Sequence, residues 1–88
     1  MADTPYIYRN ITAGATTVVK TGAGILKSIT VNTTAAGTIG IFDAVTATNP
    51  IGTLKASVGE NTYEYNVGFG TGLTIVTGAA SDITVSYR

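Results

Sequence analysis

The sequence YEYNVGF, residues 63–69, places a large apolar side chain at every second position. Alternation with a period of two is typical of a β-strand that buries one face and exposes the other. We therefore expect the two tyrosines, the valine and the phenylalanine to pack on a core. Glu64 lies on the opposite face of this predicted strand, where we expect it to meet solvent.

The same alternation recurs along the whole chain, and turn residues separate its runs. Glycines lie between or at the ends of the apolar segments, and Asn49-Pro50 marks a further turn. Clean alternation occupies residues 6–9, 25–32, 39–42 and 83–88, and shorter runs lie at 16–21, 51–56 and 72–77. Short strands at roughly 8–12-residue spacing predict an all-β fold: a single-domain antiparallel β-sandwich, jelly-roll-like, with about eight strands. The predicted domain spans residues 1–88, with residues 1–5 as a flexible N-terminal arm.

Three finer features of the sandwich follow from the pattern. Residues 25–32 alternate, with an interruption at Lys27. This alternation predicts Ile29 on one face of the strand and Leu26, with the polar side chains, on the other. Because Arg88 directly follows the last run, we expect the C-terminus to be tied into a sheet. Several predicted edge strands carry few of the charges, prolines and bulges that normally protect an edge, which indicates edges covered by neighbours.

The composition favours a protein that works by contact. Basic and acidic residues number five each, so the formal charge is zero, and charged residues make up only 11% of the chain, about half the usual share. Seventeen threonines take their place. A hydroxyl that finds a partner costs less to bury than a charge, so such a surface suits coverage by other subunits. Threonine also suits β-strands, so the fold alone explains its abundance equally well.

No combination of side chains is typical of catalysis. The carboxylates stand alone in sequence rather than in pairs, at Asp3, Asp43, Glu60, Glu64 and Asp82. The chain has no histidine to activate a hydroxyl, and neither cysteine nor histidine to bind a transition metal. We therefore predict that the protein is not an enzyme, and we assign no catalytic, cofactor-binding or metal-binding residue. Asp43, Glu60 and Asp82 are expected to stabilise turns.

Nucleic-acid binding and membrane insertion are not expected either. Lysines and arginines form no cluster that would follow a phosphate backbone. No segment approaches the roughly 20 apolar residues of a membrane helix, and the first residues lack the pattern of a signal peptide. The glycine-rich segments Gly22–Gly24 and Gly68–Gly72 precede no predicted helix, so turns or bulges are favoured over phosphate-binding loops. We expect a protein made in the cytoplasm of its host cell.

Four segments distributed between residues 24 and 88 read GILKSITVNT (24–33), IGIFD (39–43), IGTLKA (51–56) and GLTIVTGAASDITVSYR (72–88). They resemble small virion structural proteins of tailed bacteriophages, of the head decoration or cement kind. The resemblance lies in the sequence pattern of the predicted strands rather than in a catalytic signature. It implies a capsid decoration protein, located in the virion, that stabilises a phage head by protein–protein contacts. The implied partners are the chain itself, as a homotrimer, and the major capsid protein or another virion protein.

Two other functions are open at this point. A tail, baseplate or fibre component of a phage would have the same fold and composition. A carbohydrate-binding module that contacts the host surface would need exposed aromatic rings, either Tyr63 and Tyr65 or Tyr6 and Tyr8. The alternation of residues 63–69 favours core packing for the first pair, and the second pair alternatively packs on a neighbouring subunit.

Two segments are the candidates for contact with a partner. The loop Ala44–Pro50 is the longest between the predicted strands, and the composition of residues 43–49 favours a loop over a turn of helix. The segment Ala2–Tyr8 combines the N-terminal arm with the start of the first strand. Binding residues concentrate on loops that a rigid scaffold holds, although a variable surface excursion explains the loop equally well.

Overall fold

Residues 5–88 are described by the computed structural model, and within them the chain forms β-strands and no helix. The strands are β1 (Ile7–Ile11), β2 (Thr16–Thr21), β3 (Gly24–Thr33), β4 (Ile39–Phe42), β5 (Pro50–Leu54), β6 (Thr62–Phe69), β7 (Gly72–Thr77) and β8 (Asp82–Tyr87). The predicted arm falls mostly on residues 1–4, which lie outside the described part of the chain. Residues 5–88 contain no helix that could cross a membrane.

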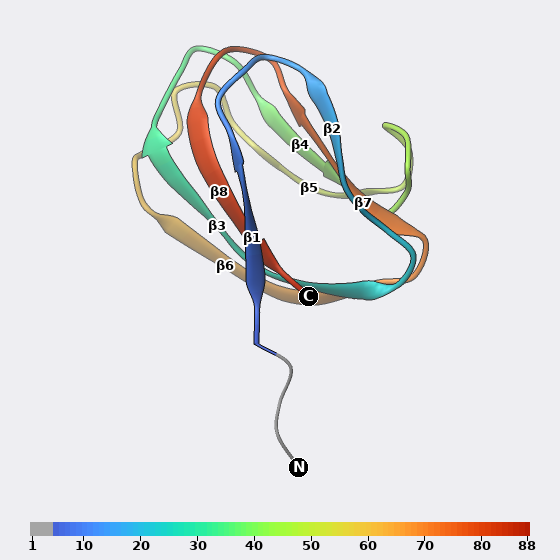
Figure 1. Cartoon of the computed structure of the whole chain (residues 1–88). Coiled ribbons are helices and arrows are strands. Elements are labelled where there is room, and N and C mark those ends of the chain that lie inside the picture. Colours follow the sequence, from blue (N-terminus) through green and yellow to red (C-terminus); the bar gives the residue numbers. More distant parts are fainter. Residues whose placement is uncertain (1–4) are drawn as a thin grey trace.

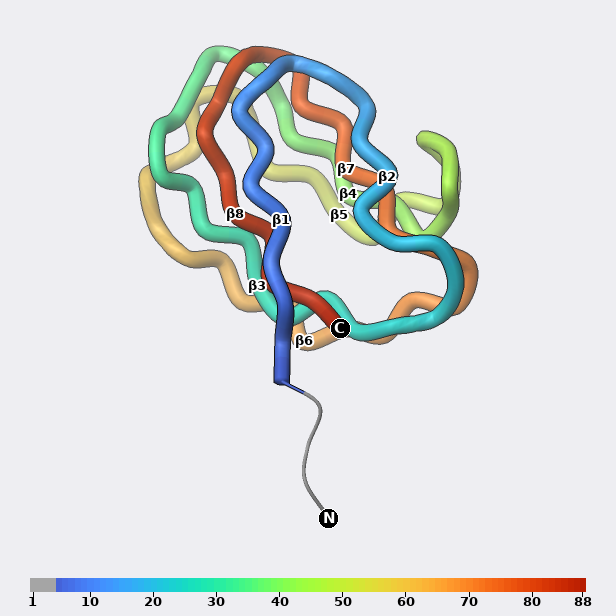
Figure 2. The backbone as a smooth tube through the Cα atoms, viewed as in Figure 1, coloured from blue at the N-terminus to red at the C-terminus, as the bar shows by residue number. Residues whose placement is uncertain are grey.

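The strands pair as one long hairpin that is folded over on itself. β1 pairs with β8, β2 with β7, β3 with β6 and β4 with β5, all antiparallel. Two further pairings, β3 with β8 and β4 with β7, roll this hairpin into two sheets (Figure 2). Sheet A has the order β1-β8-β3-β6 and sheet B the order β2-β7-β4-β5 (Figure 1). This is the arrangement of an eight-stranded jelly roll, so the predicted antiparallel β-sandwich is confirmed.

The inner faces of the two sheets share one hydrophobic core. Its fully buried side chains include Leu26, Ile29 and Val85 from sheet A and Ile41 and Ile75 from sheet B. Removing apolar surface from water stabilises a fold by about 25 cal/mol per Å². The chain has no cysteine, so no disulfide links the two sheets. Burial of apolar side chains between the sheets therefore holds them together.

One prediction about β3 is wrong, and a β-bulge explains the error. Leu26 is fully buried in the core rather than exposed on the polar face. It pairs with Tyr87 of β8, whereas Ser28 pairs with the adjacent residue Ser86, so Lys27 is an extra residue in β3. The extra residue at the bulge shifts the alternation of the strand by one position. Leu26 and Ile29 therefore both point into the core.

The expectation of several unprotected edges is also wrong, because three of the four edge strands carry a bulge. β2 has Val19 as an extra residue against β7, and β5 has Ile51 as an extra residue against β4. β6 places Tyr65 and Asn66 opposite the single residue Lys27, and Asn66 takes the left-handed conformation, with φ of 52°. Of the described edges, only β1 pairs in unbroken register.

The C-terminus is tied into sheet A, as predicted. The backbone N–H of Arg88 donates to the carbonyl of Ile25 at 2.9 Å, and the N–H of Ile25 donates to the carbonyl of Arg88 at 2.6 Å. The start of β1 lies at the same end of the sandwich (Figure 2). At the opposite end the β3–β4 and β7–β8 loops touch, since Gly37 lies directly against Gly78 and Ala79.

Candidate interaction surfaces

The carboxylates of the described chain are spread over the molecule and stabilise its strands and turns. Asp82 accepts a hydrogen bond from Asn10 Nδ2 at 2.8 Å, and Glu60 accepts one from the backbone N–H of Thr34 at 3.1 Å. Glu64 is exposed, as predicted. Residues 5–88 contain no group of three or more acidic side chains that could hold a metal ion. The remaining carboxylate, Asp3, lies outside the described residues.

Asp43 caps the tight turn between β6 and β7. Its carboxylate accepts hydrogen bonds from the backbone N–H groups of Thr71 at 2.9 Å and Gly70 at 3.1 Å. These bonds, that of Thr71 first, hold the pKa of Asp43 below its ordinary value because they stabilise the charged form. The glycine-rich segment therefore forms a turn, as expected, and its N–H groups are occupied by a carboxylate rather than open to a phosphate.

The β4–β5 loop, residues 43–49, is held at both of its ends. The backbone N–H of Asp43 donates to the carbonyl of Asn49 at 2.9 Å. The hydroxyl of Thr74, on β7, donates to the carbonyl of Ala44 at 2.6 Å, and both residues are buried. These contacts fold the start of the loop onto sheet B, and its remainder projects from the body of the sandwich (Figure 1).

The tip of this loop is exposed and uncharged. Val45 is 42% exposed, and the hydroxyls of Thr46 and Thr48 contact each other at 3.0 Å. Pro50 begins β5 rather than ending the loop, and the β5–β6 loop, residues 55–61, is equally long, so the prediction of a single longest loop is wrong. The expectation of a loop without helix at residues 43–49 is confirmed.

The outer face of sheet B, hereafter the B face, is free of charge. Its side chains come from all four strands: Thr16, Val18, Gly40, Phe42, Thr53, Thr74 and Val76. Val18 is 42% exposed, and Phe42 and Val76 are half-buried. The ring of Phe42 lies over Gly40, where an added Cβ would meet it at 2.7 Å.

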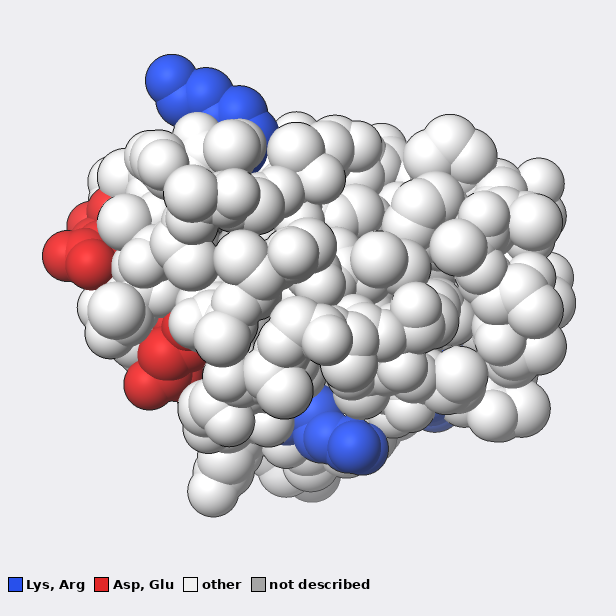
Figure 3. Space-filling view, turned by 90° about the horizontal axis from the view of Figure 1, so that it is seen from above, with Lys and Arg blue, Asp and Glu red and all other residues white. Residues whose placement is uncertain are grey.

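The strands of sheet B contain one charged residue, Lys20. Its ammonium group turns away to donate to the carbonyl of Ala23 at 2.7 Å, in the β2–β3 turn. Figure 3, which looks down on one end of the sandwich, shows few charged side chains, with the acidic ones on one side of the view. The B face and the loop residues 44–49 thus contain no charged side chain.

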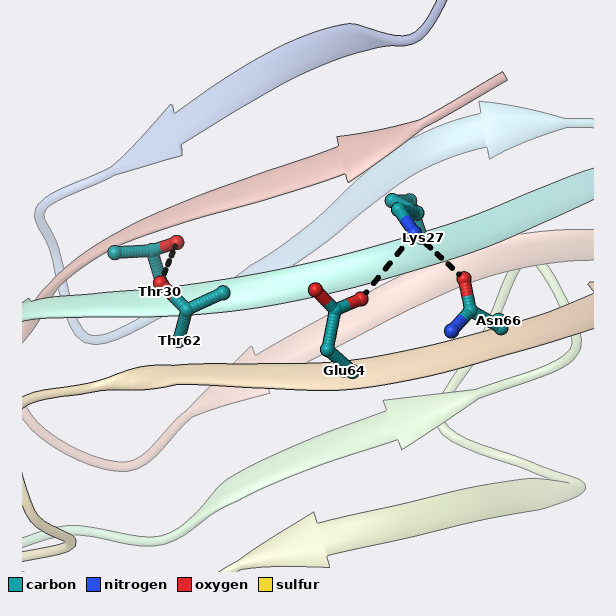
Figure 4. A network of polar contacts seen from close by, with 5 residues as sticks. All are labelled: Lys27, Thr30, Thr62, Glu64 and Asn66. Atoms are coloured by element: carbon teal, nitrogen blue, oxygen red, sulfur yellow. Dashed lines mark hydrogen bonds and ion pairs between the residues drawn. The ribbon is translucent and has the colours of Figure 1, made fainter.

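The outer face of sheet A, hereafter the A face, is covered by polar side chains that bind one another. Lys27 forms an ion pair with Glu64 at 3.4 Å and donates to Asn66 Oδ1 at 3.0 Å (Figure 4). The hydroxyls of Thr30 and Thr62 lie 3.0 Å apart across the same two strands, β3 and β6. On the β1 side of the sheet, the amides of Asn10 and Asn32 donate to the carboxylate of Asp82, and Asn32 also donates to the hydroxyl of Thr84.

The structure separates the two tyrosine pairs. Tyr63 and Tyr65 are half-buried and pack against the core, as predicted, and burial raises the pKa of Tyr65. Tyr6 is 40% and Tyr8 is 73% exposed. The ring centroid of Tyr6 lies 4.7 Å from the guanidinium carbon of Arg88, a cation–π contact. The exposed aromatic pair therefore lies at the N-terminal edge of sheet A.

Sequence reasoning missed the B face. Val18, Phe42 and Val76 belong to three strands that are far apart in the chain, and only the pairing of β2, β7 and β4 brings them together. The available signal was the absence of acidic residues from all four strands of sheet B, but the sequence does not say which strands share a sheet.

Comparison of the chain with protein-family models, with curated proteins and with solved structures gave no match.

Proposed function

We propose that the protein is a structural component of a tailed-bacteriophage virion, a decoration or cement protein that binds the shell through its B face. The observation that carries the proposal is the contrast between that uncharged face and the charged, hydrogen-bonded A face. Depletion of charge, with aromatic and aliphatic side chains at the centre, is the compositional mark of the core of a protein interface. Val18 and Phe42 supply such a centre on the B face.

The chemistry of binding is burial of uncharged surface. Threonine hydroxyls around Val18 and Val76 lose less on leaving water than charges would, so covering the B face carries a small desolvation cost. One such contact is weak, but many copies around a symmetric shell, each bridging neighbours, add up by avidity. Jelly rolls also occur as capsid domains, which agrees with this function by analogy of fold.

Gold labelling of purified particles with an antibody to the chain tests where it resides. Label over the head supports decoration of the shell. Label confined to the tail, baseplate or fibres would contradict decoration and favour the second structural function that the sequence left open. Particles without label would contradict both.

A pair of matched variants tests the B face itself. Val18→Lys and Thr62→Lys each place one lysine on an exposed strand position, the first on the B face and the second on the A face. Both variants should fold, as judged by circular dichroism. Val18→Lys should be depleted from assembled particles and Thr62→Lys retained. Equal incorporation of the two variants would contradict binding through the B face.

A second candidate function, a carbohydrate-binding module, is favoured by the exposure of Tyr8 and Tyr6 beside the amides and hydroxyls of the A face. A tyrosine ring stacks on the apolar face of a sugar while its neighbours bind hydroxyls. A glycan array with the whole chain tests this function. Specific binding that Tyr8→Ala abolishes would support it, and an array without specific signal would exclude it for the glycans displayed.

A further inference from the structure

Strand β1 differs from the other edge strands in pairing without a bulge, and Arg9 is the only charged residue that protects its edge. The edges β2, β5 and β6 each contain a bulge, and Pro50 lies at the start of β5. Bulges and prolines interrupt the row of backbone N–H and C=O groups that another strand would need. β1 pairs with β8 in regular register over its whole length, so its free edge is a regular template.

Apolar side chains at the start of β1 are exposed on both faces of the strand, whereas Ile11 at its end is buried. Ile7 shares the inner face with its partner Tyr87 and is 54% exposed, whereas Tyr8 shares the A face with its partner Ser86 and is 73% exposed. A protein docked on one face of sheet A would cover only one of them. A strand added beside β1 provides cross-strand neighbours on both faces at once.

We infer that the occupant of this edge is β1 of a second copy of the chain, paired antiparallel across a two-fold axis at Tyr8. Charge excludes the neighbouring register centred on Arg9. Arg9 is the one charged residue of β1, and a pairing centred on it would bring two guanidinium groups directly opposite each other. Centred on Tyr8, the pairing sets each Arg9 opposite the partner's Ile7 and each Asn10 opposite the partner's Tyr6. The surface is then complementary to itself, as a two-fold contact requires.

The resulting dimer has a continuous sheet formed by the two copies of sheet A. Pro5, which has no N–H to donate, falls just beyond the five residues that pair on each chain. The two Tyr8 rings become neighbours on the merged A face. A two-fold contact joins chains in pairs, so a homotrimer would need a different surface. The inferred dimer does not depend on a location in the virion, which the gold-labelling experiment tests separately.

Two measurements on the purified full chain test the inference. Light scattering coupled to size-exclusion chromatography should give a mass that rises toward twice the chain mass with concentration, and Ile7→Lys should abolish the rise. The chain has no cysteine, so a single Tyr8→Cys variant reports on the contact by disulfide formation. Residues directly opposite in an antiparallel pair lie about 4.5–5.5 Å apart at Cβ, close to the separation that a disulfide needs.

Thr53→Cys, on the bulged β5 edge, is the matched control for random collision. Under mild oxidation Tyr8→Cys should become a covalent dimer several-fold faster than Thr53→Cys. A strict monomer at the highest soluble concentration would overturn the inference. So would a trimer, or a dimer in which both cysteine variants crosslink at equal rates, because another surface would then hold the copies together.

Discussion

The A face and the B face cover the same core but differ in charge and in side-chain hydrogen bonding. Every strand of sheet A has a charged residue: Lys27, Glu64 and Asp82 lie on the A face, whereas Arg9 of β1 shares the inner side with its partner Val85. Sheet B has one, Lys20, which turns into the β2–β3 turn. Side chains of the A face form hydrogen bonds with one another, whereas the B face presents threonines, valines and the ring of Phe42.

The difference teaches which face is easier to bury. Covering the A face would break or desolvate an ion pair and several side-chain hydrogen bonds, and unpaired charges are costly to bury. Covering the B face removes apolar and hydroxyl surface from water at little cost. A protein with few charges can therefore concentrate them on one sheet and keep the other for contact.

The largest expected effect breaks the core that joins the two sheets. Ile75, on β7, is fully buried, and Ile75→Ala should lower the free energy of unfolding by about 2–5 kcal/mol. Val76, its neighbour, points outward to the B face and is half-buried, so Val76→Ala should cost about 1 kcal/mol or less. Urea denaturation followed by circular dichroism measures both. Equal losses would contradict the assignment of inner and outer faces.

The next effect concerns the β3–β4 and β7–β8 loops, two of the loops that cross between the sheets. A Cβ at Gly37, in the β3–β4 loop, would lie 2.5 Å from the backbone nitrogen of Ala79 in the β7–β8 loop. Gly37→Ala should therefore destabilise the fold by about 1–3 kcal/mol through overpacking. Gly70→Ala is the control, since nothing lies within 4 Å of its added Cβ, and should change stability by about 0.5 kcal/mol or less. Thermal melts distinguish the two.

A pH-dependent effect tests the anchor of the β4–β5 loop beside the B face. The folded-state pKa of Asp43 is lower than its unfolded value of about 3.8, so its charged form stabilises the fold above that value. This contribution is lost as the pH falls through the folded-state pKa. Wild type should be more stable than Asp43→Asn at neutral pH, and the gap should narrow on acidification. A gap that stays constant with pH would contradict the cap.

The smallest effect comes from the A face. The Lys27–Glu64 pair is largely exposed, with side-chain exposures of 38% and 57%, so solvent screens it. Lys27→Met should cost about 0.5 kcal/mol or less at low salt, and less at high salt. Lys55→Met, at an exposed lysine without an ion pair among the described residues, is the control and should show no salt dependence. A large loss for Lys27→Met would mean that the A face contributes to the fold itself.

Local pattern was sufficient to predict the strands but not their surfaces. The alternation at Thr16–Thr21 and Gly72–Thr77 matches the observed bounds of β2 and β7, since side-chain period is a local property. The placement of Leu26 was wrong because the bulge at Lys27 depends on the partner strands β8 and β6. The cap that Asp43 forms on the β6–β7 turn and the composition of the B face likewise arise from residues distant in sequence.

Cysteine protection on assembled particles tests the B-face account most directly. Val18→Cys and Thr62→Cys introduce single thiols on the B face and the A face of a chain that has none. Both should react with a maleimide at similar rates in the free protein. On the particle, Val18→Cys should be protected and Thr62→Cys should react as before. If Val18→Cys reacts equally fast on the particle and in solution, the B face is not the contact surface.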